Sequence, residues 1–174
     1  MIGYDLLTHA IGWGGTLCCV AAYQFSSSRK LVFCELLCAL LYTVHYFMLG
    51  AYTGSLTMVL SLFANAVSCG NKAWMRRRVW PAGFLVMFLV SAAVTWEGWL
   101  SLLPSVATVL TCTANFIRNG KLIRLNRLCL VCPMWMVYNI CSHSWSGMAC
   151  ELMVAGSILL SVFRYGLKSL DRMN

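Results

Sequence analysis

Two ionisable side chains stand in otherwise uncharged, apolar stretches of the sequence, and they are the first candidates for chemistry. His45 lies within LLYTVHYFMLG, and Glu151 lies within GMACELMVAGS. Histidine changes its charge near neutral pH, and a carboxylate in an apolar helix needs a partner or a water-filled cavity. If the two side chains meet, each stabilises the charged form of the other, which suits a gate, proton coupling or cation recognition. The alternative for His45 is a hydrogen bond to a neighbouring helix.

Further polar and aromatic residues recur at helical spacing around this pair. One stripe follows the spacing i, i+3, i+7 and i+10 on a single helix face: Glu35, Cys38, Tyr42 and His45. Glu35 follows Lys30 by about one turn, so we expect these two to pair at the inner surface. The residues predicted to line a path or form a gate are His45, Glu151, Asn65, Tyr42, Trp135, Tyr138 and Asn139.

The composition indicates that these helices cross a membrane. The chain is 60% hydrophobic and 10% charged, with a mean hydropathy of +0.75, whereas soluble domains are roughly a quarter charged. Its 174 residues divide into seven spans of about 20 residues, which predicts an all-α protein with a single integral membrane domain over residues 1–174. The start, MIGYDLLTHA, lacks the basic region of a cleaved signal peptide, so we expect the first span to be retained. The predicted spans are 9–25, 31–49, 56–72, 79–96, 99–117, 128–145 and 148–167.

The basic residues alternate between the connections. All 13 lie at the end of the first, third, fifth or seventh span or in the stretch that follows it, and the other connections have none. By the positive-inside rule, this pattern places the N-terminus outside and the C-terminus in the cytoplasm. It also explains the net charge of +8 without a nucleic-acid partner.

The chain also resembles itself at an offset of 93 residues. This offset pairs Tyr42 with Trp135, and it pairs Gly54 with Gly147. We therefore expect two repeats, at about 9–72 and 99–167, joined by a linker helix at about 79–96. An intervening single span makes the two triple-helix repeats parallel, in a 3+1+3 arrangement about an axis along the membrane normal.

Three stretches resemble a known family. They are HYFMLGAYTGS, SLLPSVATVLTCTANF and WMVYNICSHSWSGMACELMVAGSILLSVFR. With these landmarks in order over nearly the whole chain, the sequence is similar to the YgjV family of bacterial inner-membrane proteins and, more broadly, to the MtN3, SWEET and PQ-loop group. The resemblance implies two triple-helix bundles around a central path in the bacterial inner membrane. SWEET facilitators commonly carry prolines in the first two helices of both bundles, whereas Pro104 and Pro133 face Ile11 and Leu40 at the repeat offset. The resemblance therefore implies architecture rather than a sugar site.

These observations favour a transporter or facilitator for a small polar solute, with proton sensitivity as an option. The alternative is a non-transporting receptor or assembly protein on the same fold. No nucleophile-elbow, P-loop or dinucleotide motif is present, so we expect no enzyme, catalytic residue or cofactor. The expected partners are the lipid bilayer and the solute, and a homo-oligomer remains open.

The ten cysteines predict little chemistry. Cys129 and Cys132 form a single C-x-x-C pair with no second pair or nearby histidine, so no metal site is expected. Cys141 and Cys150 are the pair best placed for a disulfide near the outer face. Most of the others lie in spans, where a thiol packs as a small apolar group.

Overall fold

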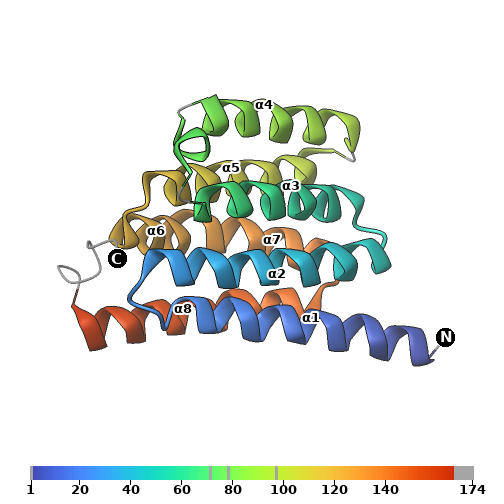
Figure 1. The fold of residues 1–174 in the computed structure, drawn as a ribbon. Helices are drawn as coiled ribbons and strands as arrows, with labels where there is room; N and C mark the ends of the chain where they lie inside the picture. Colours follow the sequence, from blue (N-terminus) through green and yellow to red (C-terminus); the bar gives the residue numbers. More distant parts are fainter. Residues whose placement is uncertain (1, 71, 78, 97, 167–174) are drawn as a thin grey trace.

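The computed structural model describes residues 2–70, 72–77, 79–96 and 98–166, and this part of the chain is helical with no strand. Its helices form seven rods that run side by side (Figure 1). One rod consists of α6, a π-helical turn η3 and α7 in direct succession. The helices are α1 Ile2–Ala22, α2 Ser28–Met48, α3 Tyr52–Cys69, η1 Ala73–Arg76, α4 Val79–Val94, η2 Trp99–Ser101, α5 Leu102–Ile117, α6 Gly120–Asn126, η3 Arg127–Val131, α7 Cys132–Cys141 and α8 Trp145–Tyr165.

The seven rods match the seven predicted spans in order, although their membrane character differs. Four segments within the described residues are long and apolar enough to cross a membrane: Ser28–Met48, Tyr52–Cys69, Trp99–Ile117 and Trp145–Tyr165. Leu6–Ala22 and Val79–Val94 are shorter apolar helices. The sixth rod differs most from expectation because it begins at Gly120, eight residues before the predicted start at 128. Arg124 and Arg127 therefore belong to a helix and not to a connecting loop.

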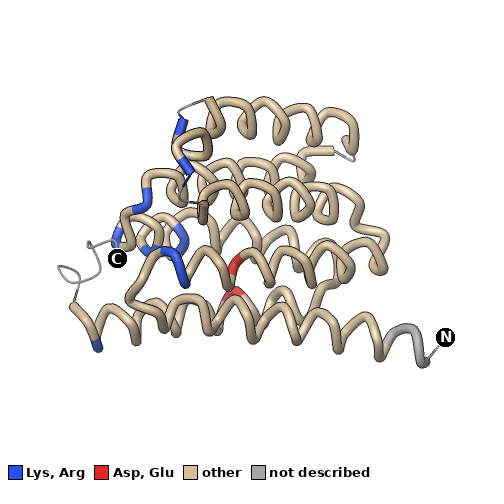
Figure 2. Tube along the Cα trace, in the orientation of Figure 1, with Lys and Arg blue, Asp and Glu red and all other residues tan. Residues whose placement is uncertain are grey.

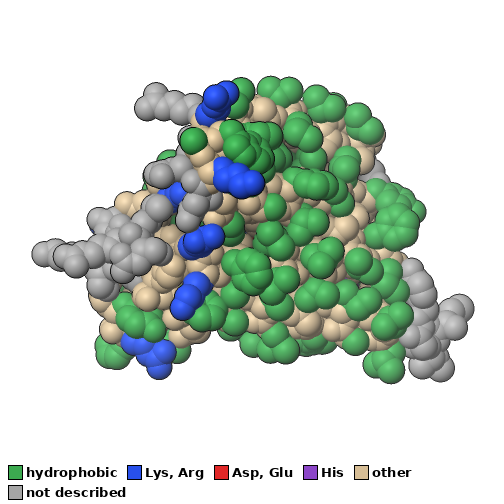
Figure 3. Space-filling view, viewed as in Figure 1, with side chains coloured by type: hydrophobic (Ala, Val, Ile, Leu, Met, Phe, Trp, Pro, Cys, Tyr) green, Lys and Arg blue, Asp and Glu red, His purple; other side chains and the backbone are tan. Residues whose placement is uncertain are grey.

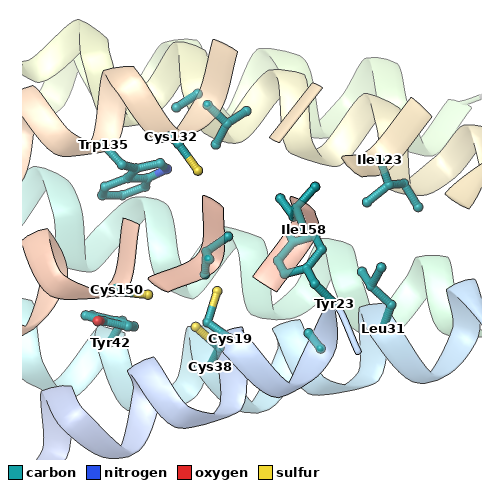
Figure 4. Packing of buried hydrophobic residues seen from close by; sticks show 14 of the residues in the cluster. Cys19, Tyr23, Leu31, Cys38, Tyr42, Ile123, Cys132, Trp135, Cys150 and Ile158 are labelled. Carbon is teal, nitrogen blue, oxygen red and sulfur yellow. The ribbon is translucent and has the colours of Figure 1, made fainter. Parts of the chain in front are cut away.

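The rods pack in a way that places distant parts of the chain together. α1 packs against α2 and α8, while α3 packs against α2, α4 and α5. α7 in turn contacts α5 and α8. Most of the buried apolar side chains form one cluster, in which Tyr23, just after α1, lies with Leu31 of α2 and Ile158 of α8 near Ile123 of α6 (Figure 4). A smaller cluster, centred on Phe84 and Phe88, joins α4 to α3 and α5.

The surface and the interior have the reverse of the usual polarity. Large apolar side chains cover the surface shown in Figure 3, and Phe163, Trp99 and Val94 are 90%, 79% and 75% exposed. In contrast, Asn139, Asn115 and Glu151 are among the many polar residues that are buried. A lipid solvent explains both observations, because apolar side chains face the acyl chains and polar groups find partners inside the bundle.

Charge is separated along the rods. The coloured Lys and Arg positions gather at the ends near the C-terminus, and α1 begins at the opposite end (Figure 2). Two of these residues donate hydrogen bonds to carbonyl groups at the ends of helices. Arg118 donates to the carbonyls of Ser68 and Gly70 at the end of α3. The fully buried Arg124 likewise donates to the carbonyls of Tyr23 and Phe25 after α1. A cation is favourable at a helix C-terminus, where backbone carbonyls lack helical partners.

Candidate functional site

A cavity lies between the helices of both halves of the chain. Its volume is about 70 Å³, which is enough for several water molecules or a solute of a few non-hydrogen atoms. Five of the seven predicted lining residues are on its wall, and His45 and Tyr138 are not. The wall is formed by Cys19, Glu35, Cys38, Ala39, Tyr42, Tyr46, Met58, Ser61, Asn65, Thr108, Thr111, Arg127, Trp135, Asn139, Gly147, Cys150 and Glu151.

An ion pair on the cavity wall joins the sixth and seventh rods. Arg127 Nη2 donates to Glu151 Oε1 at 2.7 Å, and the side chains are 11% and 5% exposed. Arg127 begins the π-helical turn η3, a type of irregularity that often occurs at functional sites. Arg127 Nε and Glu151 Oε2 have no hydrogen-bond partner. The pair therefore presents one free donor and one free acceptor beside the cavity.

A second carboxylate, Glu35, lies on the same wall. It is 8% exposed, and its two oxygens accept hydrogen bonds from Tyr23 Oη and Asn115 Nδ2, both at 2.7 Å. Asn115 also donates to Asn65 Oδ1 at 3.0 Å. The expected pairing of Glu35 with Lys30 at the inner surface is therefore wrong, because the carboxylate points into the bundle, toward α1 and α5. These bonds of Asn115 join α5 to α2 and α3.

Stacked aromatic rings form another part of the wall. Tyr46 stacks on Tyr42, with 5.5 Å between ring centroids, and on Trp135, with 5.8 Å. The Tyr46 hydroxyl donates to Asn139 Oδ1 at 2.6 Å, which joins α2 to α7. Asn139 Nδ2 has no partner, so this corner of the cavity presents a second free donor.

His45 takes part in a separate network near the end of α2. Its Nδ1 lies 2.9 Å from the carbonyl oxygen of Thr8, and because a carbonyl only accepts, Nδ1 carries the proton. Its Nε2 lies 2.9 Å from Ser144 Oγ and 3.2 Å from Ser146 Oγ. Since both ring nitrogens have other partners and Glu151 pairs with Arg127, the predicted bridge between His45 and Glu151 is wrong. The alternative, a histidine that hydrogen-bonds to neighbouring helices, is confirmed.

Tyr138 also holds helices together outside the cavity. Its hydroxyl accepts a hydrogen bond from the Gly54 backbone nitrogen at 2.9 Å, which joins α7 to the first turn of α3. Tyr138 faces a more open pocket near the helix ends, together with Cys141 and His143. Its place is therefore beside the cavity rather than on its wall.

Thiols gather on one side of the cavity. Cys19, Cys38 and Cys150 come from α1, α2 and α8 and lie next to one another beside Tyr42 (Figure 4). All three are free, as is Cys141, so the disulfide considered between Cys141 and Cys150 does not form. Within the described residues, no group of three or more His, Cys, Asp or Glu side chains has a geometry that could hold a metal ion.

Sequence reasoning missed three important wall residues: Glu35, Arg127 and Tyr46. The helical spacing from Glu35 to His45 could have identified Glu35 as a wall residue, because it places Glu35 on the same helix face as Tyr42. Arg127 was counted with the charges that set topology, because it follows other basic residues closely. Only the folded structure shows that Arg127 is buried on the cavity wall, where it pairs with Glu151.

The helical fold, the apolar surface and the polar residues buried inside the bundle define an integral membrane protein. The family model Imp-YgjV, described as a bacterial inner membrane protein, matches residues 6–169. The chain therefore belongs to this family of bacterial inner membrane proteins. No curated protein and no solved structure matches it.

Proposed function

We propose that the protein transports or facilitates the passage of a small polar solute, which binds in the cavity. The observation that carries this proposal is the set of unpartnered polar atoms on its wall: Arg127 Nε, Asn139 Nδ2 and Glu151 Oε2. A buried polar group without a partner costs free energy. A solute or water that satisfies these atoms recovers this energy, so an occupant with polar groups is favoured beside them, while the rest of the cavity surface is mostly apolar.

The helix contacts support the proposed 3+1+3 arrangement. The contacts of α1 with α2 and of α2 with α3 have counterparts in those of α5 with α7 and of α7 with α8. The contact of α1 with α8 corresponds to that of α3 with α5, as a twofold relation requires. α4 has no counterpart and packs against α3 and α5, as a linker helix would. Parallel repeats of this kind place a transport site between the two bundles.

The orientation that we propose follows from the charges. The basic ends of the rods face the cytoplasm, which leaves the start of α1 on the outer side. In this orientation Tyr46 is the outermost residue of α2 on the cavity wall, and Glu35 is the innermost. The Tyr46–Asn139 bond then closes the outer side, and the bonds of Glu35 close the inner side. Transport requires these two closures to open in turn, by rocking of one bundle against the other.

The test is solute entry into liposomes that contain the purified protein. Ser61 lies on the wall and donates only within α3, to Thr57 O, so it offers a matched pair of variants. We expect urea, glycerol, ethanolamine or glycolate to enter at least ten times faster with the wild type and Ser61→Ala than with Ser61→Met, which fills the cavity. Entry no faster than into protein-free liposomes for all four solutes would overturn the proposal. Binding without entry would instead favour the non-transporting receptor.

A further inference from the structure

The chemistry of the cavity also indicates which solute it accepts. Resting on the proposed function, we infer that the cavity selects a small organic monocation, a primary ammonium compound, with Glu35 as its charge partner. The inference depends on three features of the wall: its balance of charges, its aromatic rings and its unpartnered atoms.

The charges on the wall do not cancel. It has two carboxylates, Glu35 and Glu151, and one cation, Arg127. Arg127 pairs with Glu151, the one ion pair within the described residues. Glu35 receives hydrogen bonds from the neutral donors Tyr23 and Asn115. Such bonds stabilise a carboxylate but leave its charge in place, so the wall keeps one negative charge that a monovalent cation would balance.

The other buried cation, Arg124, is near enough to Glu35 for their charges to interact, but it forms no ion pair with it. Arg124 is fully buried but is not on the cavity wall. Its guanidinium donates to the carbonyls of Tyr23, Phe25 and Gly120 and to Ser161 Oγ. These acceptors occupy its donors at the ends of helices, away from the cavity. Among the residues of the wall itself, carboxylates therefore outnumber cations by two to one.

The aromatic rings favour an organic cation over a bare metal ion. Tyr42, Tyr46 and Trp135 form a stacked row on the wall, and the negative faces of such rings attract ammonium groups. A small alkali or alkaline-earth ion instead requires a cage of several oxygen ligands. An ammonium group beside Glu35 would balance its charge, while Arg127 Nε and Asn139 Nδ2 can donate to an oxygen elsewhere on the same molecule. A small amine that carries a hydroxyl group has both kinds of group.

Four probes of similar size separate the role of charge from that of size. They are ethanolamine, ethylene glycol, glycolate and glycine, which are a cation, a neutral molecule, an anion and a zwitterion at pH 7. Binding to the purified protein is measured by titration calorimetry and by the shift in thermal unfolding. We expect ethanolamine to bind at least tenfold more tightly than the other three. Equal or tighter binding of any of them, or no binding of ethanolamine, would overturn the inference.

Variants then test the assigned charge partner. Glu35→Gln should weaken ethanolamine binding at least tenfold, whereas Arg164→Gln, at an exposed position, should leave it unchanged. A second pair of variants leaves Glu35 unchanged. Met58→Lys places an ammonium group beside the cavity, and Met58→Gln is its neutral control. We expect the Lys variant to unfold at a higher temperature than the Gln variant and to lose ethanolamine binding. The reverse order of unfolding temperatures would contradict a cation site.

The two proposals fail in different ways. If glycolate or ethylene glycol enters liposomes and Ser61→Met blocks the entry, the transport proposal stands and the cation inference falls. If no solute enters but ethanolamine binds in a manner that depends on Glu35, the cation site stands and transport falls.

Discussion

Tyr46 and Asn139 are joined by a hydrogen bond of 2.6 Å although they are 93 residues apart, which is the offset at which the sequence resembles itself. Each residue is thus bonded to its own counterpart in the other half of the chain. A contact between equivalent positions is expected on a twofold axis, where the two copies meet. This bond also borders the cavity, so one pair of residues connects the proposed repeat to the candidate site.

Removing this bond should loosen the side of the cavity that we propose to face outward. Tyr46→Phe deletes the hydroxyl and leaves Asn139 Oδ1 without its donor, so we expect the free energy of unfolding to fall by about 1 kcal/mol. Tyr52→Phe is the matched control because Tyr52 is 54% exposed. Denaturant titration of the protein in micelles measures both. Equal stability of the two variants would show that the bond does not contribute.

Breaking the buried ion pair should cost more than losing a surface charge. Arg127→Gln and Glu151→Gln each leave a buried charge without its partner, so each should destabilise the protein by about 3–5 kcal/mol. The double variant should be less destabilised than the sum of the two, because no unpaired charge remains. Arg164→Gln should change stability by less than about 0.5 kcal/mol. Additive effects in the double variant would argue against coupling between Arg127 and Glu151.

Two glycines should respond in opposite ways to the same substitution. A Cβ added at Gly12 would meet Ser146 Oγ and lie 2.8 Å from the His45 ring, whereas one added at Gly156 meets nothing within 4 Å. Gly12→Ala should therefore disrupt the His45 network and lower the unfolding temperature. Gly156→Ala should leave the unfolding temperature unchanged or raise it, because alanine is more favourable than glycine in a helix by about 1 kcal/mol. A harmless Gly12→Ala would show that α1 and α2 are not so closely packed there.

The orientation in the membrane can be tested with thiol labelling of intact cells. Cys141 is exposed near the proposed outer ends of the rods, so an impermeant maleimide should label the wild type but label Cys141→Ser much less. Ser146, at the same side, is fully buried and is unsuitable for labelling. In the Cys141→Ser background, Arg77→Cys should react only after the membrane is permeabilised. Labelling in the reverse pattern would invert the proposed topology.

The sequence predicted the class of structure well, because that class depends on properties summed over many residues. An apolar composition with few charges requires a lipid solvent, and backbone groups in lipid must be satisfied within helices. The positions of the basic residues and of the apolar runs therefore predict seven helical rods. Helical spacing also placed Glu35 and Tyr42 on one face, and both lie on the cavity wall.

The partners of the polar side chains were decided only by the tertiary structure. Spacing fixes which residues share a face, but the rotation, depth and neighbours of each helix are set by the packing of all the rods together. Glu151 could reach His45 or Arg127 in principle, and the early start of the sixth rod at Gly120 brings Arg127 to it. His45 instead forms hydrogen bonds with Thr8 and Ser144. Glu35 accepts hydrogen bonds from Tyr23 and Asn115 and does not pair with Lys30. The pairing of a buried polar group depends on contacts between helices far apart in sequence, and local patterns do not contain that information.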